Sequence, residues 1–267
     1  MEQQLIEAVN DGDAEVTLAL LRDNPRLDVN WIGDTCWSAL HSASANGFSK
    51  IVENLLAHPA IEVNVPARRN TTPFSLACLF GKVLTVRLLL KDPRVDITLA
   101  DEYDHTPLWW ASRSGHPAVI EWIIASGRDS NPERKGQLGE DGDFLSPLEV
   151  ARRCEKAGAV SLLERFTANP VQTRHEVRAK LGMLDALAAD LFAITIFIHE
   201  DLLQLNPTAI TLSPNATLFF AITLRLPMEL QMILCHRAVG SAKGSILSKD
   251  SEVAFKALAR ILSSPQK

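Results

Sequence analysis

Side chains that could carry out a reaction are few and scattered in this sequence of 267 residues. The four cysteines form no C-x-x-C pair, so they indicate neither a zinc site nor a disulfide framework. The acidic run 140–143 lacks the twelfth-position carboxylate of a calcium loop, and the run 199–201 has no second histidine at ligand spacing. No G-x-S-x-G, phosphate-loop or HExxH motif occurs. We therefore expect no metal, no cofactor and no catalytic residue.

Binding is the chemistry that the residue types favour. Trp37, Phe80, Tyr103 and Arg113 are large and partly amphipathic, like the residues that dominate the binding energy of protein interfaces. Each lies close to one end of a short apolar pattern that recurs along the chain. The elements that position these side chains are therefore the repeats themselves.

Three glycines spaced by 34 residues, Gly47, Gly81 and Gly115, each close one copy of that pattern. The copies are Ser38–Ala43, Thr72–Ala77 and Thr106–Ala111. A Ser or Thr that caps a helix, Pro in the first turn and a glycine that ends it predict a short helix. A second apolar run at helical spacing follows each glycine, which predicts helix, turn, helix. Because so short a unit cannot bury its apolar face alone, several units must stack.

These copies resemble the T-P-L-H-x-A signature of ankyrin repeats, whose period is about 33 residues. The resemblance implies an all-α ankyrin-repeat solenoid of helix-turn-helix units with hairpin loops. Degenerate copies at 5–21 and 146–164 bring the expected number of units to five, with Glu155 in the place of a glycine. The polar insertion 126–145 is expected to be an exposed loop.

Beyond residue 168 the repeat stops and a helical segment follows. Helices are expected at 172–181, 183–205, 215–224, 227–239 and 250–262. We expect residues 1–168 to form the array and 169–267 a helical domain packed on it as a cap. The whole chain also resembles a group of ankyrin-array proteins of fungi and other eukaryotic microbes, through 106–112, 161–166, 173–178 and 226–237.

In ankyrin arrays the hairpin tips and the last residues of each first helix line the concave face that binds partners. By register with this resemblance, the tips contribute Trp37, Arg68, Arg69, Tyr103 and His105. The helix ends contribute Leu79, Phe80 and Arg113. The alternative for each is packing against the neighbouring repeat.

Three polar residues of the pattern are expected to stabilise the fold by bonding to backbone. His41 is expected to bond neighbouring backbone, and Asn30 and Asn64 to hold hairpins through side-chain bonds to backbone. Trp109 takes the place of the motif histidine and is expected to pack mostly, with part of its ring exposed.

The charge is divided unevenly between the two parts of the chain. Ten basic and eight acidic residues lie at 171–267, which leaves seventeen and twenty-four, a net −7, for the repeat part. An acidic array disfavours binding of nucleic acid. The apolar run 191–198 is too short to span a membrane, and the N-terminal residues lack the pattern of a signal peptide. We expect an intracellular monomer, cytoplasmic or nuclear.

The sequence thus favours a non-catalytic protein-binding module. An alternative is a substrate receptor of a cullin-type ubiquitin ligase, because Leu226–Leu230 followed by Ile233–Leu234 resembles the start of an F-box within 226–262. Arg237 departs from that pattern, and a core helix begun by proline is the explanation that the sequence favours. A third interpretation is an enzyme whose site is assembled in the C-terminal segment.

Overall fold

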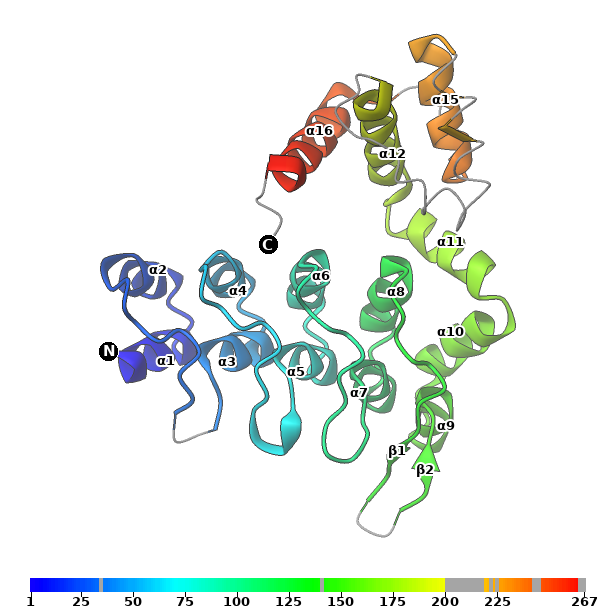
Figure 1. Ribbon diagram of the computed structural model, residues 1–267. Helices are drawn as coiled ribbons and strands as arrows, with labels where there is room; N and C mark the ends of the chain where they lie inside the picture. Colours follow the sequence, from blue (N-terminus) through cyan, green and yellow to red (C-terminus); the bar gives the residue numbers. More distant parts are fainter. Residues whose placement is uncertain are drawn as a thin grey trace. The chain divides into compact units, whose positions relative to one another are not determined.

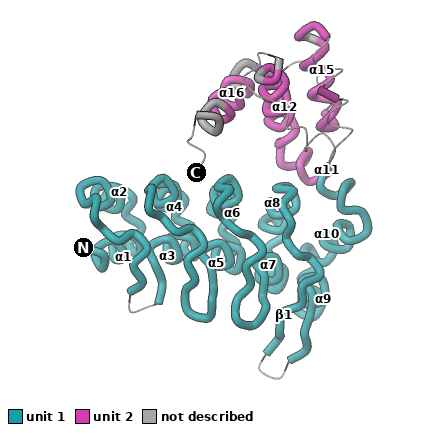
Figure 2. The backbone as a smooth tube through the Cα atoms, viewed as in Figure 1, with its two compact units in different colours: residues 1–174 teal, residues 175–267 magenta. Residues whose placement is uncertain are grey.

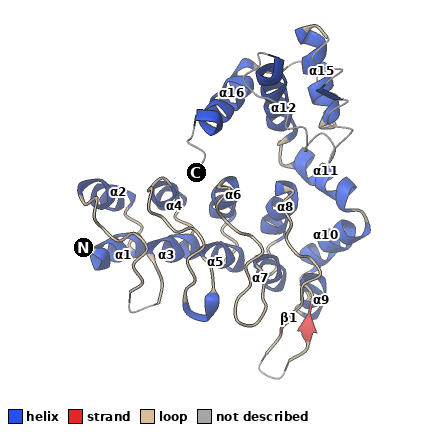
Figure 3. Cartoon of the chain, in the orientation of Figure 1, coloured by secondary structure: helices blue, strands red, loops and turns tan. Residues whose placement is uncertain are grey.

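A computed structural model describes residues 1–33, 36–139, 142–199, 219–220, 223, 226–241 and 246–263. They belong to two compact units, Met1–Arg174 and His175–Lys267 (Figure 2). Helices make up most of the described residues in both units (Figure 3). The predicted domain division after residue 168, and the predicted packing of the C-terminal domain on the array, stay predictions.

Unit 1 is a row of helix pairs, as the repeat pattern predicts (Figure 1). The pairs are α1 (Glu2–Asn10) and α2 (Ala14–Asp23), α3 (Ala39–Asn46) and α4 (Ser49–Leu56), α5 (Pro73–Leu79) and α6 (Val83–Lys91), α7 (Pro107–Ser114) and α8 (Pro117–Ser126), and α9 (Pro147–Arg153) and α10 (Ala157–Ala168). The first helices of the pairs contact one another in sequence, and so do the second helices. We call these the first and second rows; the hairpin loops extend from the first row (Figure 1).

The first-row helices α3, α5, α7 and α9 each follow a Ser or Thr N-cap, whereas α1 follows Met1. Thr72 Oγ1 accepts a hydrogen bond from Ser75 N at 3.2 Å, and Thr106 Oγ1 accepts one from Trp109 N at 3.2 Å. Each cap satisfies a backbone N–H that the first turn of a helix leaves without a partner. Proline follows both caps, where its missing N–H is not needed.

The same helices end at residues with left-handed backbone. Gly81 has φ +65°, a conformation that glycine adopts without steric penalty. Glu155 takes the equivalent place after α9 with φ +55°. The degenerate fifth unit therefore keeps the turn of the pattern while losing its glycine.

The core of unit 1 lies between the two rows and between successive pairs. Side chains exposed by at most 2% come from both rows, among them Leu40, Ile51, Leu55, Phe74, Leu89, Leu108, Ile120 and Ile124. Small alanines such as Ala43, Ala77 and Ala111, all at 0%, let the paired helices approach closely. This is the stacked core that short repeats need, since none of them buries its apolar face alone.

Polar side chains join each repeat to the next one. Asn30 Nδ2 donates to Ala60 O at 2.8 Å, while Asn30 Oδ1 accepts from Glu62 N at 2.8 Å. Asn64 repeats this arrangement with Arg94 O and Asp96 N. The expected bonds from asparagine to backbone are confirmed, and they reach the following hairpin.

Two ring N–H groups make a second set of connections. His41 Nε2 lies 3.1 Å from Thr71 O, and Trp109 Nε1 donates to Leu145 O at 2.9 Å. Both acceptors immediately precede the capping residue of the next first-row helix. Trp109 therefore makes the bond to the next repeat that His41 makes in the second repeat. Its side chain is 1% exposed, so the prediction that part of the ring is exposed is wrong.

The insertion before α9 is more ordered than the predicted exposed loop. Strands β1 (Gly136–Gln137) and β2 (Phe144–Leu145) pair antiparallel, with Gly136 opposite Leu145. Gln137 N also donates to Tyr103 O at 3.0 Å, which attaches β1 to the preceding hairpin. Backbone hydrogen bonds, which side-chain composition does not reveal, are what order this segment.

Unit 2 contains helices close to the predicted ranges. They are α11 (Pro170–Lys180), which starts in unit 1, α12 (Leu184–His199), α15 (Met228–Ala238) and α16 (Ser248–Ser263). Ala189, Ala193 and Ala254 form a small buried cluster between α12 and α16, and the rings of Phe192 and Phe255 meet edge to face at 6.2 Å. Most of the predicted helix 215–224 and the predicted end of the helix 183–205 lie outside the described residues.

A glycine pair tests the register of the repeats. A Cβ on Gly81 would lie 2.7 Å from the ring of His116, whose Nε2 is 3.0 Å from Leu79 O; a Cβ on Gly139, also left-handed, would meet nothing within 4 Å. Replacement by alanine should therefore lower the free energy of unfolding by about 2 to 4 kcal/mol at Gly81 and about 1 kcal/mol at Gly139. Urea titration measures both; equal losses would show that the His116 contact does not matter.

The buried His41 in the second repeat of unit 1 gives a pH dependence. Burial lowers the pKa of His41 from 6.5 to about 4, so the folded protein holds this ring neutral where the unfolded chain binds a proton. Stability should fall as pH decreases from about 6.5 toward 4, by about 2 kcal/mol between pH 7 and pH 5. The His41→Gln variant should show a smaller loss over the same interval in urea titrations. An identical loss in both proteins would assign the pH dependence to other groups.

Candidate functional site

The predicted tip arginines lie on an exposed turn. Arg68 and Arg69 belong to a short 3-10 turn, Arg68–Asn70, in which Arg69 has φ +63°. The Arg69 guanidinium lies 5.5 Å from the ring centroid of Tyr103 and 3.4 Å from a carboxylate oxygen of Glu102. Glu102 N also donates to Arg69 O at 3.1 Å. The second hairpin is thus attached to the tip of the third.

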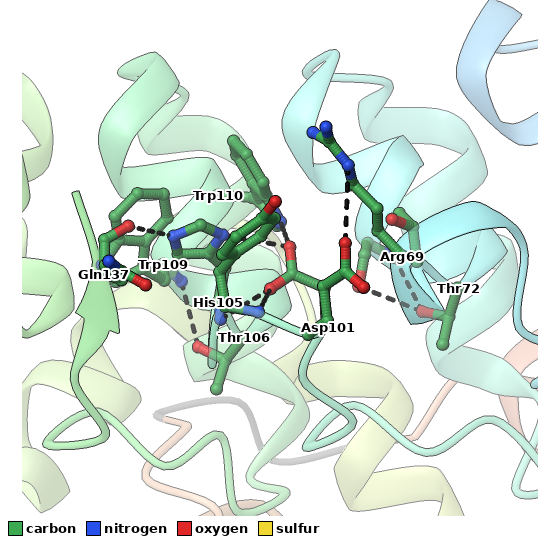
Figure 4. Close-up of polar contacts among 12 residues, drawn as sticks. Arg69, Thr72, Asp101, His105, Thr106, Trp109, Trp110 and Gln137 are labelled. Atoms are coloured by element: carbon green, nitrogen blue, oxygen red, sulfur yellow. Dashed lines mark hydrogen bonds and ion pairs between the residues drawn. The ribbon is translucent and has the colours of Figure 1, made fainter. Parts of the chain in front are cut away.

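Asp101 is the centre of the third hairpin (Figure 4). Its Oδ2 accepts from Trp110 Nε1 at 3.1 Å and lies 3.0 Å from His105 Nδ1. Its Oδ1 accepts from the backbone N–H groups of Tyr103 and His105, both at 3.0 Å. Burial raises the pKa of the Asp101 carboxyl. The hydrogen bonds from His105 and Tyr103, together with the charge interaction with the His105 ring, lower this pKa by more, so the net shift is downward.

His105, predicted to contact a partner, is occupied inside the chain. It is 6% exposed, its Nε2 lies 2.5 Å from Gln137 O, and its ring stacks on Trp109 at 3.8 Å. Figure 4 shows the ring between Asp101 and Gln137. Both ring nitrogens lie against oxygen atoms of the same chain, one of the Asp101 carboxylate and one of the Gln137 backbone. His105 therefore connects the third hairpin to β1 and is too buried to contact a partner.

The predicted helix-end residues remain accessible. Phe80, at the end of α5, is 48% exposed, and Leu79 beside it is half-buried. Arg113 is exposed near the end of α7, with its guanidinium 5.5 Å from the ring centroid of Trp110 and 5.9 Å from that of Trp109. Such cation–π contacts hold a charged side chain in one place without burying it.

The first hairpin is described only in part. Trp37 is half-buried, and its carbonyl accepts from Gly33 N at 3.4 Å. Residues 34–35 at the tip lie outside the described residues. The structure joins the second and third hairpins through Arg69 and Tyr103, and the third hairpin to the end of α7 through Trp110. Phe80 lies at the end of α5, the first-row neighbour of α7. We call Arg69, Phe80, Tyr103, Trp110 and Arg113 the contact surface.

Reasoning from the sequence did not find two of the residues that build this surface. The crowding of Trp109, Trp110 and Trp122 in one repeat predicts packing for Trp110, and the sequence pattern predicts no role for Asp101. The signal for Asp101 was its position four residues before a histidine in a hairpin, where a carboxylate can accept from nearby backbone N–H groups. Trp110 follows the position of the motif histidine and gave no signal of its own.

Comparison with known proteins identifies the repeats. Residues 40–134 match the family model for ankyrin repeats in three copies. This chain contains ankyrin repeats. The matched residues contain the helix pairs from α3 to α8, with their hairpins and both Thr-Pro starts.

Several curated proteins are similar in sequence to parts of this chain. A probable E3 ubiquitin-protein ligase of Oryza sativa subsp. japonica, XBOS32, is 31% identical over 210 residues, which cover 69% of this chain and 42% of that protein. The transient receptor potential cation channel subfamily A member 1 of Drosophila melanogaster is 31% identical over 133 residues, 48% of this chain and 10% of the channel. The scaffold protein ILK of Cavia porcellus is 36% identical over 59 residues, 22% of this chain and 13% of that protein. The chain spans less than half the length of each of these relatives.

Among the residues that the structure describes, no group of three or more His, Cys, Asp and Glu side chains is placed to hold a metal ion. No helix among these residues has the length and apolar content needed to cross a membrane. The acidic run 140–143 and the run 199–201 each lie partly outside these residues.

The network of the third hairpin predicts an asymmetry between neighbouring acids. Asp101→Ala removes a buried carboxylate with four hydrogen-bonding partners and should lower the free energy of unfolding by about 3 kcal/mol. Glu102→Ala removes a solvent-exposed ion pair and should change it by less than about 1 kcal/mol. Urea titration followed by tryptophan fluorescence measures both. Similar values for the two variants would contradict the central place of Asp101.

Proposed function

We propose that this ankyrin array binds a protein partner through the contact surface. The observation that carries the proposal is that Phe80 and Arg113 stay exposed while Arg113 is held on the Trp109 and Trp110 rings. Large side chains that are already ordered lose little conformational freedom on binding, which favours affinity. Interfaces are enriched in these residue types.

The predicted residues around this surface extend it. Arg68 is exposed beside Arg69, Leu79 is half-buried beside Phe80, and Trp37 belongs to the preceding hairpin. A protein partner laid across the tips could therefore contact successive repeats. The name of the guinea-pig relative, a scaffold protein, is consistent with a binding role of this kind.

A triple substitution tests the proposal. Phe80, Tyr103 and Arg113 are replaced by alanine, and the control variant replaces Val16, Leu18 and Leu84, which are 46%, 48% and 62% exposed on the second row. Truncated interface anchors lose about 2 kcal/mol or more each, so the first variant should lose its protein partners in affinity purification with mass spectrometry. The control should keep them, and circular dichroism should show both folded. Equal recovery of partners by both variants would place the binding site elsewhere.

A second candidate function is substrate recruitment to a ubiquitin ligase. Two rice relatives are named probable E3 ubiquitin-protein ligases, and the F-box-like segment 226–262 includes α15 and α16. Met228 and Leu230, in the first turn of α15, are 58% and 46% exposed, as a docking helix requires. In this proposal the array binds the target and the C-terminal segment binds the ligase adaptor.

Co-purification distinguishes this candidate from simple binding. If it is correct, the cullin and its adaptor should co-purify with the full chain and be lost after Met228→Glu with Leu230→Glu. The triple variant of the array should retain them, because it affects only target binding. Purified samples of the full chain that contain neither protein would reject the ligase function and leave the binding function intact.

A further inference from the structure

Two arginines occupy one position in successive ankyrin repeats. Arg113 and Arg153 each follow the capping residue of their helix by seven positions, Thr106 for α7 and Ser146 for α9. Both side chains are exposed, and α7 and α9 are neighbours in the first row. Phe80 lies one repeat earlier at the end of α5, eight positions after Thr72 and next to Leu79 at the seventh. The row therefore presents an aromatic ring and then two guanidinium groups.

Neither of these arginines has a carboxylate partner within the residues that the structure describes. Two acids on the same elements are engaged elsewhere: Asp101 with His105 and Trp110, and Glu149 with Ser146 N at 2.7 Å and Lys135 at 3.7 Å. Glu155, exposed two positions after Arg153, makes no ion pair with it. Arg152, the immediate neighbour of Arg153, shows the contrast, since it pairs with Glu164 at 2.7 Å.

The repeat part has a net charge of −7, and Arg113 and Arg153 place two cations at one position of neighbouring first-row helices. A carboxylate-bearing partner is attracted locally to these two positions and repelled by much of the remaining surface. Charge complementarity at this point on the array therefore favours an acidic ligand.

The spacing limits the shape of that ligand. Packed helices lie about 8 to 10 Å apart, which separates equivalent residues of α7 and α9 by a similar distance. A polyproline II segment has three residues per turn and rises about 3.1 Å per residue, so every third side chain points the same way about 9 Å further on. Such a segment running along the first row would offer one side chain to each repeat.

We propose that the partner segment is an extended acidic peptide with two carboxylates three residues apart, one on Arg113 and one on Arg153. An apolar residue three positions away from the first carboxylate packs on Phe80. This inference rests on the proposed binding function and adds the chemistry of the ligand and Arg153 as a further contact residue.

Selection from a random peptide library displayed on phage, with the full chain as bait, tests the inference. Enriched peptides should share an apolar residue and two Asp or Glu residues at three-residue spacing. Bait carrying Arg113→Glu with Arg153→Glu should lose this preference and select Lys or Arg at the same places. The matched control, Arg26→Glu with Lys91→Glu, makes the same change of net charge at two exposed positions away from the first-row ends and should select the original peptides.

Affinities then separate this inference from the binding function. A fluorescein-labelled synthetic copy of the most enriched acidic peptide should bind the arginine variant at least about tenfold more weakly than the parent in fluorescence anisotropy. Enriched peptides that lack acids but are lost with Phe80→Ala would overturn the acidic ligand and keep the binding function. Peptides unaffected by every variant of this face would overturn both. A selection that enriches no peptide would overturn the inference of a linear ligand.

Discussion

A hydrogen bond from a side-chain N–H to a backbone carbonyl in the next repeat is the interaction on which unit 1 depends. His41 reaches Thr71 O, Trp109 reaches Leu145 O, and Asn30 and Asn64 reach the carbonyls of the following hairpins. Apolar burial drives the stacking but has little directional preference, whereas these bonds fix how far one repeat is shifted along the next. Losing one donor would leave a carbonyl without its partner, which costs about 1 to 3 kcal/mol where the group is buried.

The accessible residues follow from this arrangement. The ring bonds end just before α5 and α9, and the asparagine bonds lie along the hairpins, while Phe80 and Arg113 are exposed at the opposite helix ends. In the third hairpin Asp101 accepts hydrogen bonds from the backbone N–H groups of Tyr103 and His105. These bonds hold Tyr103 in place beside the Arg69 guanidinium. A rigid support beneath exposed aromatic and cationic groups is a suitable basis for recognition, because little order has to be imposed when a partner arrives.

The sequence predicts the repeats well because their signals are local. Thr72 and Thr106 predict helix starts because each caps a backbone N–H three positions further on, and Gly81 predicts a helix end because its own backbone is left-handed. His105 and Trp109 could not be placed in this way, because their roles are set by Gln137 and Leu145, more than thirty positions away. The ends of α5 and α7 were located by period alone, so the exposure of Phe80 and Arg113 was predictable while the cation–π support was not.

The insertion before α9 shows how this kind of molecule tolerates a change of length. The bond from His41 joins residues 30 positions apart, and the equivalent bond from Trp109 joins residues 36 positions apart, yet both end at the same place in the next repeat. The extra residues leave through the β1–β2 hairpin and return without disturbing the stack. Since the entropy of closing a loop grows only with the logarithm of its length, further lengthening at this hairpin would cost a few tenths of a kcal/mol. The β1–β2 tip is therefore a natural place to graft a foreign peptide for display or detection.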